Sequence, residues 1–516
     1  MNGLAPTIMV QGTASSAGKS LLVTALCRFF RREGLRVAPF KSQNMALNSA
    51  VTVDGLEIGR AQAVQAEASG ILSCVDMNPI LLKPESDRRS QVVVLGKLIG
   101  SMTATEYHEY KPRLSMVIAE SLKRLRVDYD LVVIEGAGSP AEINLKSRDI
   151  VNMHVAKLAD APVLLVGDID RGGVFASFVG TMELLEPDER ARVAAFVVNK
   201  FRGDMALLKP GLDFLTERTG KPVLGVVPYI QGLRIADEDS VSLEDRMARR
   251  RPSQQEIDIV VVRLPRLSNY DDVEALEHEA GVVVRFVEQP DEIQGADLVI
   301  LPGSKNTVSD LSWLRTRGIA GAIEARAHVG KPILGICGGC QMLGEVIDDP
   351  HGVESPETQV RGLGLLSLRT HFERKKVTAQ VLARVVRASF LTNGMVVEEE
   401  VLGYEIHMGT VEPRHPRTGP FEIRSRNGHM DVCTDGVISS NGMVVGTMLH
   451  GLFENEVIRA HTLAFLRSRR GIPECSARQR IPSKQDEYDR LEVVVREHID
   501  CELLWRLTGL CLRARG

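Results

Sequence analysis

The feature that most constrains the fold is a set of short apolar runs that close on Gly or Asp and recur through the first half of the chain. Runs of this kind are typical of strands buried on both faces of a parallel sheet. Longer amphipathic stretches, such as 20–33 and 110–126, separate them and suit the crossover helices of βαβ units. The first half therefore predicts a doubly wound α/β domain. The runs are Thr7–Val10, Leu131–Ile134, Val163–Val166, Val193–Val198 and Val223–Val227.

A charged stretch that contains a proline, 244–256, interrupts this pattern and predicts a linker. Strand-like runs then resume at Ile257–Val262, Val282–Val287, Leu298–Leu301 and Ile333–Ile336. We therefore expect two doubly wound α/β domains with mainly parallel sheets and a helical C-terminal extension. The predicted boundaries are 1–248, 249–460 and 461–516.

Length and composition limit the class of protein. At 516 residues, 44% hydrophobic and 25% charged, the chain is larger than one core usually grows. A formal charge of -4 and an aromatic content of 4% argue against a nucleic-acid partner. No apolar run approaches the ~18 residues of a membrane span. Eight scattered cysteines do not form a disulfide framework, so we expect a cytoplasmic protein without a membrane partner.

A glycine-rich loop, 12–20, lies between the first predicted strand and the first predicted helix. Such a loop directs backbone N–H groups at phosphates near a helix N-terminus. Five residues separate its two glycines, one more than in the standard phosphate-loop pattern. Lys19 would neutralise phosphate charge and Ser20 would hold Mg²⁺. A strand-to-helix turn with an incidental Lys-Ser pair is the alternative. The expected ATP-binding residues in the loop are Gly12, Thr13, Ala17, Gly18, Lys19 and Ser20.

Two other strand ends carry polar residues that suit the same site. Glu135 follows the run 131–134 and is the candidate for a second Mg²⁺ ligand, because a hard cation prefers carboxylate oxygen. An ordinary glutamate exposed at a strand end is the alternative. Asn199 follows the run 193–198 and is expected to face the nucleotide base, since ligands bind at the carboxyl edge of such sheets.

In the second half, Cys337 stands between a strand and the pair Gly338-Gly339, and a helix is expected to follow. This arrangement predicts a nucleophile elbow built around sulfur. The N–H of Gly338 is a candidate oxyanion donor, and Gly303, which follows a separate strand, is a second. A thiol needs a base to be nucleophilic at neutral pH, and His450 at the end of another strand run is our candidate.

Cys337 and Cys340 also form a C-x-x-C pair, so a redox dithiol or half of a zinc site must be considered. The sequence offers no second pair that would complete a zinc site. The pair also follows an α/β strand beside two glycines, which favours the elbow.

These motifs resemble one family. Residues 335–341 resemble the G-x-C-x-G-x-Q elbow of class I glutamine amidotransferases, and the long phosphate loop resembles that of the dethiobiotin synthetase group. Their fusion is characteristic of the cobyrinic and cobyric acid synthases. Five further segments resemble the cobyric acid synthase family, and the resemblance covers roughly residues 5 to 460. The segments are 39–49, which contains Lys41, and 57–63, 78–84, 263–269 and 403–409.

The resemblance implies ATP- and glutamine-dependent amidation of the b, d, e and g carboxylates of adenosylcobyrinic acid a,c-diamide. ATP, Mg²⁺, L-glutamine and the corrinoid are then the expected cofactors and substrates, with Lys41 among the ATP-binding residues. The nearest alternative is the related synthase that amidates the a and c carboxylates. A partitioning-type ATPase is a more distant one, and it would leave the cysteine elbow without a function.

The sequence departs from the wider amidotransferase pattern at one place. Most class I members carry a glutamate two residues after the histidine, but Leu452 stands there and the nearest acid is Glu454. A Cys337–His450 dyad is therefore predicted with its third member open. In the wider class the glutamine of the elbow contacts substrate glutamine, so Gln341 is a binding candidate.

Overall fold

The computed structural model describes residues 3–86, 88–235, 251–415, 419–473 and 482–510. The chain forms two compact units, and each contains segments that are distant in sequence. The first unit comprises Met1–Ala46, Ile58–Glu238 and Pro482–Gly516, and the second comprises Leu47–Glu57 and Asp239–Ile481.

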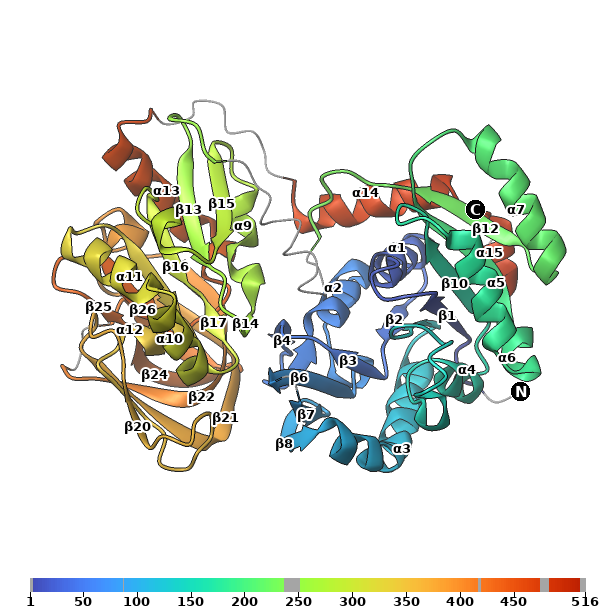
Figure 1. Ribbon diagram of the computed structural model, residues 1–516, viewed down its shortest axis with the longest axis horizontal. Coiled ribbons are helices and arrows are strands. Elements are labelled where there is room, and N and C mark those ends of the chain that lie inside the picture. The colour runs from blue at the N-terminus through green and yellow to red at the C-terminus, as the bar shows by residue number, and fades with distance from the viewer. Residues whose placement is uncertain (1–2, 87, 236–250, 416–418, 474–481, 511–516) are drawn as a thin grey trace. The chain divides into compact units, whose positions relative to one another are not determined.

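The core of the first unit is a fully parallel six-stranded sheet with the order β12-β11-β10-β1-β9-β2 (Figure 1). All five apolar runs of the first half are strands of this sheet, as predicted. Its buried strands are rich in Val, Ile and Leu, the composition of strands covered on both faces. The strands are β1 (Thr7–Gly12), β2 (Val37–Phe40), β9 (Leu131–Glu135), β10 (Val163–Asp168), β11 (Val193–Phe201) and β12 (Val223–Pro228).

Crossover helices and a small second sheet complete the N-terminal part of this unit. The sheet has the order β3-β6-β7-β8, from β3 (Gln43–Met45), β6 (Ile80–Ser86), β7 (Arg89–Val94) and β8 (Lys97–Thr103). Thr103 and Glu106 form a capping box at the start of α3, which satisfies two N-terminal amides. The helices are α1 (Lys19–Arg32), α2 (Arg60–Ser69), α3 (Ala104–Asp128), α4 (Met153–Ala159), α5 (Val174–Leu184), α6 (Pro187–Arg192) and α7 (Met205–Thr219).

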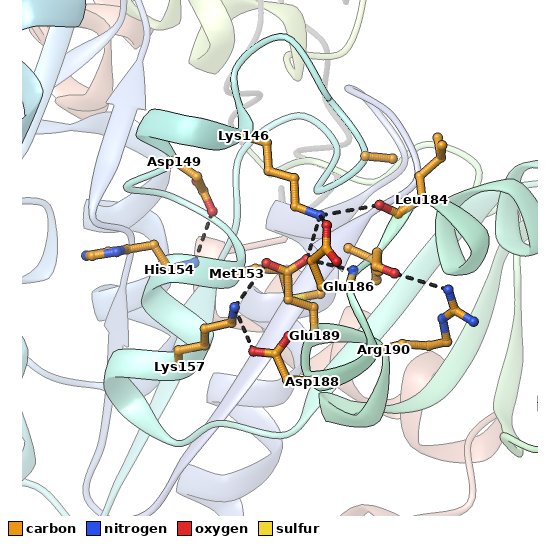
Figure 2. Close-up of polar contacts among 12 residues, drawn as sticks. Lys146, Asp149, Met153, His154, Lys157, Leu184, Glu186, Asp188, Glu189 and Arg190 are labelled. Atoms are coloured by element: carbon orange, nitrogen blue, oxygen red, sulfur yellow. Dashed lines mark hydrogen bonds and ion pairs between the residues drawn. The ribbon is translucent and has the colours of Figure 1, made fainter.

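An ionic network fixes the loop after β9 and helix α4 to helix α6 (Figure 2). Lys146 in the loop approaches Glu186 at 3.2 Å and Glu189 at 2.9 Å. Lys157 in α4 approaches Asp188 at 2.8 Å and Glu189 at 3.1 Å. Glu189 lies at the centre of the network, and only 7% of its side chain is exposed.

The C-terminal helices α14 (Lys484–Glu497) and α15 (Cys501–Thr508) belong to the first unit. Arg28 of α1 donates to Asp489 at 2.8 Å, and the Phe30 ring lies 5.3 Å from that of Trp505, edge to face. The Asp500 N–H donates to the Leu224 carbonyl, which extends the edge of the sheet at β12. The C-terminal segment is helical, as predicted, and the structure shows in addition that α14 and α15 pack into the core of the first unit.

The second unit contains another mainly parallel sheet, with the order β15-β13-β16-β18-β26-β25 and only its edge pair β25–β26 antiparallel. Its strands are β13 (Ile257–Val262), β15 (Val282–Val287), β16 (Leu298–Leu301), β18 (Ile333–Ile336), β25 (Val437–Ile438) and β26 (Val444–Thr447). The four runs predicted in the second half are strands of this sheet. Its helices are α9 (Glu274–Glu277), α10 (Thr307–Thr316), α11 (Ile319–His328), α12 (Gly338–Leu343) and α13 (Glu456–Arg470).

A largely antiparallel sheet, which the sequence pattern did not reveal, packs into the same core. Its strands are β19 (Val346–Asp348), β20 (Gln359–Arg361), β21 (Leu368–Val385), β22 (Glu400–Pro413), β23 (Phe421–Arg426) and β24 (His429–Asp435). Two short strands, β14 (Leu267–Ser268) and β17 (Gly303–Ser304), form a separate ribbon. Strand β4 (Ser49–Val51) also belongs to this unit.

The predicted boundary at 248 lies outside the described residues, and the one at 460 lies within α13. The compact units group the chain differently, with residues 47–57 in the second unit and the helices beyond residue 482 in the first. In the part of the chain that the structure describes, no helix has the length and apolar character needed to cross a membrane.

Candidate active site

Cys337 forms the sharp turn between β18 and α12. Its φ of 50° and ψ of -110° place a non-glycine residue in a strained region, which costs of order 1–3 kcal/mol. The turn is held from both sides, because the Cys337 N–H donates to the Thr447 carbonyl at 2.8 Å and the Gln341 N–H donates to the Cys337 carbonyl at 3.0 Å. Strain at a buried cysteine that the surrounding strands hold in place agrees with the predicted nucleophile elbow.

His450 follows β26 and is fixed by backbone and ring contacts. It exchanges two backbone hydrogen bonds with Tyr404, and the two rings stack with centroids 5.2 Å apart. The Nδ1 of His450 lies 2.7 Å from Oδ2 of Asp272, whose Oδ1 accepts the Gly451 N–H at 2.7 Å. Asp272 is thus the residue that orients the histidine, the position that the sequence left open.

Electrostatics favour the charged form of His450. Burial alone would lower the pKa of this histidine, but the Asp272 carboxylate and the charge of Cys337 outweigh burial and raise its pKa to about 10. The contribution of Cys337 to this raised pKa reflects its position close to the imidazole. The fold therefore gathers a thiol, an imidazole and a carboxylate in one buried group, the set of side chains that a cysteine nucleophile and its base require.

A second buried carboxylate fixes the chain just before His450. Asp435 accepts the Met448 N–H at 3.0 Å and also bonds the Thr447 hydroxyl. Burial raises the pKa of Asp435 to about 7. The Thr447 carbonyl also accepts the Cys337 N–H. Asp435 therefore helps to hold the backbone at Cys337 as well as the segment just before His450.

The other predicted residues of this site lie around the dyad. Gly303 pairs with Ser268 in the β14–β17 ribbon, where a Cβ would lie 3.2 Å from Cε1 of His450. Gly338 begins α12, and a Cβ there would lie 2.8 Å from the Ser304 amide nitrogen. Gln341 is buried, and its Oε1 accepts a hydrogen bond from the Thr307 hydroxyl at 3.0 Å. The fold brings all three into one neighbourhood.

Cys340 has a different environment from Cys337. It is fully buried in α12 and packs so closely against β26 that a Cβ on Gly446 would lie 2.7 Å from its sulfur. Burial raises the pKa of the Cys340 thiol well above its usual value. Both cysteines are free thiols, and among the described residues no three His, Cys, Asp or Glu side chains gather as a metal site.

In the first unit, the phosphate loop connects β1 to α1 as predicted. Gly18 has a φ of 94°, a conformation that glycine adopts at little cost. The Lys19 ammonium folds back over the loop and donates to the carbonyls of Ala14 at 3.1 Å and Gly138 at 3.3 Å. The Thr13 N–H donates to the Val166 carbonyl at 2.9 Å, which anchors the loop to β10. Gly12 ends β1 under the Lys19 side chain.

Glu135 is fully buried at the end of β9, and three predicted residues meet there. Its Oε1 accepts from the Ser20 hydroxyl at 2.8 Å and the Lys41 ammonium at 2.9 Å. Its Oε2 accepts from the Gln65 amide at 2.6 Å. A carboxylate beside a hydroxyl supplies the oxygen donors that Mg²⁺ prefers, so the residues present fit that ion.

Asn199 and its neighbour bind the loop from β11. The Asn199 amide donates to the Ala17 carbonyl at 2.9 Å, so the side chain lies against the phosphate loop. Lys200 donates to the Ser16 carbonyl and to Asp168 at the end of β10, both at 2.8 Å. Asp168, which ends β10, is a residue of this site that the sequence pattern did not predict.

Comparisons with known proteins agree with this division of the chain. A family model described as a CobQ/CobB/MinD/ParA nucleotide binding domain matches residues 8–243, and one described as a CobB/CobQ-like glutamine amidotransferase domain matches residues 258–458. The cobyric acid synthase of Sorangium cellulosum (strain So ce56) is 63% identical, with 98% of this chain and 99% of the relative covered. The cobyric acid synthase of Dehalococcoides mccartyi (strain CBDB1) is 51% identical, with 99% of this chain and 100% of the relative covered.

Proposed function

Because the chain belongs to the cobyric acid synthase family of glutamine amidotransferase-type ligases, we propose that it amidates the b, d, e and g carboxylates of adenosylcobyrinic acid a,c-diamide. ATP and L-glutamine are the other substrates, and the cytoplasm, which supplies both, is the proposed compartment. The observation that carries the proposal is the connected set of Cys337, His450 and Asp272 on the same chain as a complete phosphate loop.

In the glutaminase half-reaction, the Cys337 thiolate attacks the side-chain carboxamide of glutamine. His450 gives its proton to the departing nitrogen, so ammonia leaves and a thioester remains. His450 then takes a proton from water, and hydrolysis of the thioester releases glutamate. Asp272 holds the imidazole in the required tautomer.

Three further residues are assigned to binding in this half-reaction. The N–H groups of Gly338 and Gly303 are the proposed donors to the tetrahedral oxyanion, which needs preorganised hydrogen bonds where negative charge develops. Gln341 is the proposed contact for substrate glutamine. Its position next to the elbow in α12, in the neighbourhood of Gly303 and Gly338, supports this assignment.

In the synthetase half-reaction, a corrinoid carboxylate attacks the γ-phosphate of ATP and releases ADP. The acyl phosphate that forms has a good leaving group, and ammonia displaces phosphate to give the amide. The residues that would bind ATP are Gly12, Thr13, Ala17, Gly18, Lys19, Ser20, Lys41 and Asn199. Ser20 and Glu135 would hold Mg²⁺, which neutralises phosphate charge when bound.

The test is an assay of the purified protein with ATP, Mg²⁺, glutamine and the corrinoid diamide, followed by mass spectrometry. We expect up to four successive mass changes that correspond to replacement of OH by NH₂, one for each of the b, d, e and g carboxylates. Lys19→Ala should remove amidation and leave glutamine hydrolysis, because the lysine serves phosphate charge. A parallel reaction with cobyrinic acid distinguishes the proposed activity from that of the related synthase, which would amidate the a and c carboxylates of that substrate. ATP hydrolysis that neither glutamine nor corrinoid changes would contradict the proposal.

A further inference from the structure

Residues 47–57 form a hairpin, here called the inserted hairpin, that belongs to the second unit although residues of the first unit flank it in the chain. Its turn is closed by a Thr52 N–H bond to the Leu56 carbonyl at 2.8 Å and a Gly55 N–H bond to the Thr52 carbonyl at 2.9 Å. Gly55 supplies the positive φ of 74° that the turn needs.

The inserted hairpin is fixed to β21 by partly buried polar contacts. The Thr378 hydroxyl donates to the Gly55 carbonyl at 2.7 Å, and the Gln380 amide donates to the Val51 carbonyl. Lys376 and Glu57 form an ion pair in which both side chains are almost fully buried. Contacts of this kind are costly to break, since each partner would be left desolvated and uncompensated.

On its other side, the inserted hairpin reaches the residues that surround the dyad. Val51 packs in an apolar cluster with Tyr404 and Ile406. Tyr404 stacks on the His450 ring, and the Ile406 carbonyl accepts the Cys337 thiol at 3.6 Å. The hairpin therefore touches the immediate neighbours of both reacting side chains.

A polar chain runs through Asn269, which is buried and adopts a φ of +52°. Its amide donates to the Ser49 carbonyl at 3.2 Å and to the Tyr404 hydroxyl at 2.9 Å. Next to it, the Tyr270 N–H donates to the Asn48 side chain at 3.2 Å. The Asn269 carbonyl in turn accepts the N–H of Asp272, so the hairpin supports the turn that carries the orienting carboxylate.

We infer that the inserted hairpin is a positioning element of the glutaminase site and that Asn269 is the residue through which it acts. This inference rests on the proposed function, since it assumes that Cys337 and His450 hydrolyse glutamine. The hairpin holds the Asn269–Asp272 turn and the Tyr404 ring, and these two hold His450. A small displacement of a reacting group can cost about a hundredfold in rate.

The test compares Asn269→Gly and Asn48→Ala with the wild type in the full-length protein. Glycine retains the positive φ at position 269 and removes both side-chain hydrogen bonds. We expect the glutaminase kcat of Asn269→Gly to fall about 10- to 100-fold, with the KM for glutamine within about threefold and ammonium-driven amidation unchanged. Asn48→Ala should produce a smaller effect in the same direction. Val53→Ala, at an exposed position of the hairpin, is the matched control.

A second measurement does not depend on glutamine turnover. The rate at which iodoacetamide alkylates Cys337 should fall in Asn269→Gly, and its pH profile should shift, because His450 is less well held. If the wild type hydrolysed no glutamine, the proposed function would fail, and alkylation would still decide the role of the hairpin. Unchanged alkylation and an unchanged profile in a folded variant, or an equal loss of ammonium-driven amidation, would overturn the inference.

Discussion

Oδ2 of Asp272 lies 2.7 Å from Nδ1 of His450, although 178 residues separate the two in sequence. The same carboxylate accepts the N–H of Gly451, so it fixes both the ring and the backbone beside it. This contact determines which ring nitrogen faces Cys337, and it is the basis of the first prediction.

Asp272→Asn should lower the glutaminase kcat by about 10²- to 10⁴-fold, because an amide can stabilise the wrong tautomer of His450. The pKa of His450 is raised to about 10, so the imidazolium is retained at neutral pH and lost as the pH rises through that value. Without the Asp272 carboxylate the imidazolium loses its proton at a lower pH. The alkaline limb of the profile of rate against pH should therefore shift to lower pH. Asp271→Asn is the matched control, and an unchanged alkaline limb in Asp272→Asn would contradict the assignment.

Cys337→Ser should abolish glutamine-dependent amidation, with a loss of at least about a thousandfold, because a hydroxyl is far harder to deprotonate than a thiol. High ammonium should restore turnover, since the acyl phosphate accepts free ammonia. His450→Ala should behave in the same way. The measurement is amidated corrinoid with glutamine alone against ammonium alone. Failure of ammonium to rescue either variant, while the wild type uses ammonium well, would rule out the two-step scheme.

Cys340→Ser should retain glutamine-dependent turnover within about an order of magnitude. Cys340 is buried in α12 with a pKa well above its usual value, so we expect packing to be its main role. A lower Tm is expected, because the hydroxyl is buried among apolar groups. A loss as severe as that of Cys337→Ser in a folded protein would favour a dithiol mechanism.

Glu135→Gln should raise the Mg²⁺ concentration needed for half-maximal ATP use by about tenfold or more, because a neutral amide is a poorer ligand for a hard cation. Glutamine hydrolysis should persist. Glu142→Gln, at an exposed position in the loop after β9, is the matched control. If the Mg²⁺ dependence of Glu135→Gln equalled that of the wild type, Glu135 would not be a ligand.

Glu189→Gln should reduce the free energy of unfolding by about 1 kcal/mol at pH 7. Burial alone would raise the pKa of Glu189, but hydrogen bonds from Lys146, Lys157 and a backbone amide lower it overall. A lowered pKa contributes stability above the ordinary value of 4.5, and that contribution is lost as the pH falls through the folded value. The difference in the free energy of unfolding between Glu189→Gln and the wild type, measured by urea unfolding, should therefore disappear below about pH 4.5. The exposed Glu183→Gln is the control, and a difference that became larger in acid would exclude this role.

Local sequence patterns predicted those elements whose conformation depends mainly on residues that lie close together in the sequence. Apolar runs predicted five strands of the first parallel sheet and four of the second, although not β2 or β25, and glycines beside Cys337 predicted the sharp turn there, because turn and strand preferences are encoded over a few residues. Strand β21 has both exposed and buried residues along its length and offers no comparable run. Its antiparallel sheet was therefore missed.

Asp272 could not be located in this way. The carboxylate was sought two residues after the histidine, where Leu452 is buried in the core instead. Only the tertiary fold brings the turn after β14 to the end of β26, and the sequence signal was limited to the two aspartates that follow the segment 263–269. The place of the hairpin around Asn48 in the second unit was hidden for the same reason, because non-local contacts define it.

The packing of Trp505 on α1 also fixes the order in which a growing chain can finish its domains. Arg28 and Phe30 are translated before the second unit is complete, whereas their partners Asp489 and Trp505 follow it in the sequence. Every residue of the second unit is synthesised before them. During synthesis the second unit can therefore complete its core while the first unit still lacks the helices α14 and α15 that pack on α1.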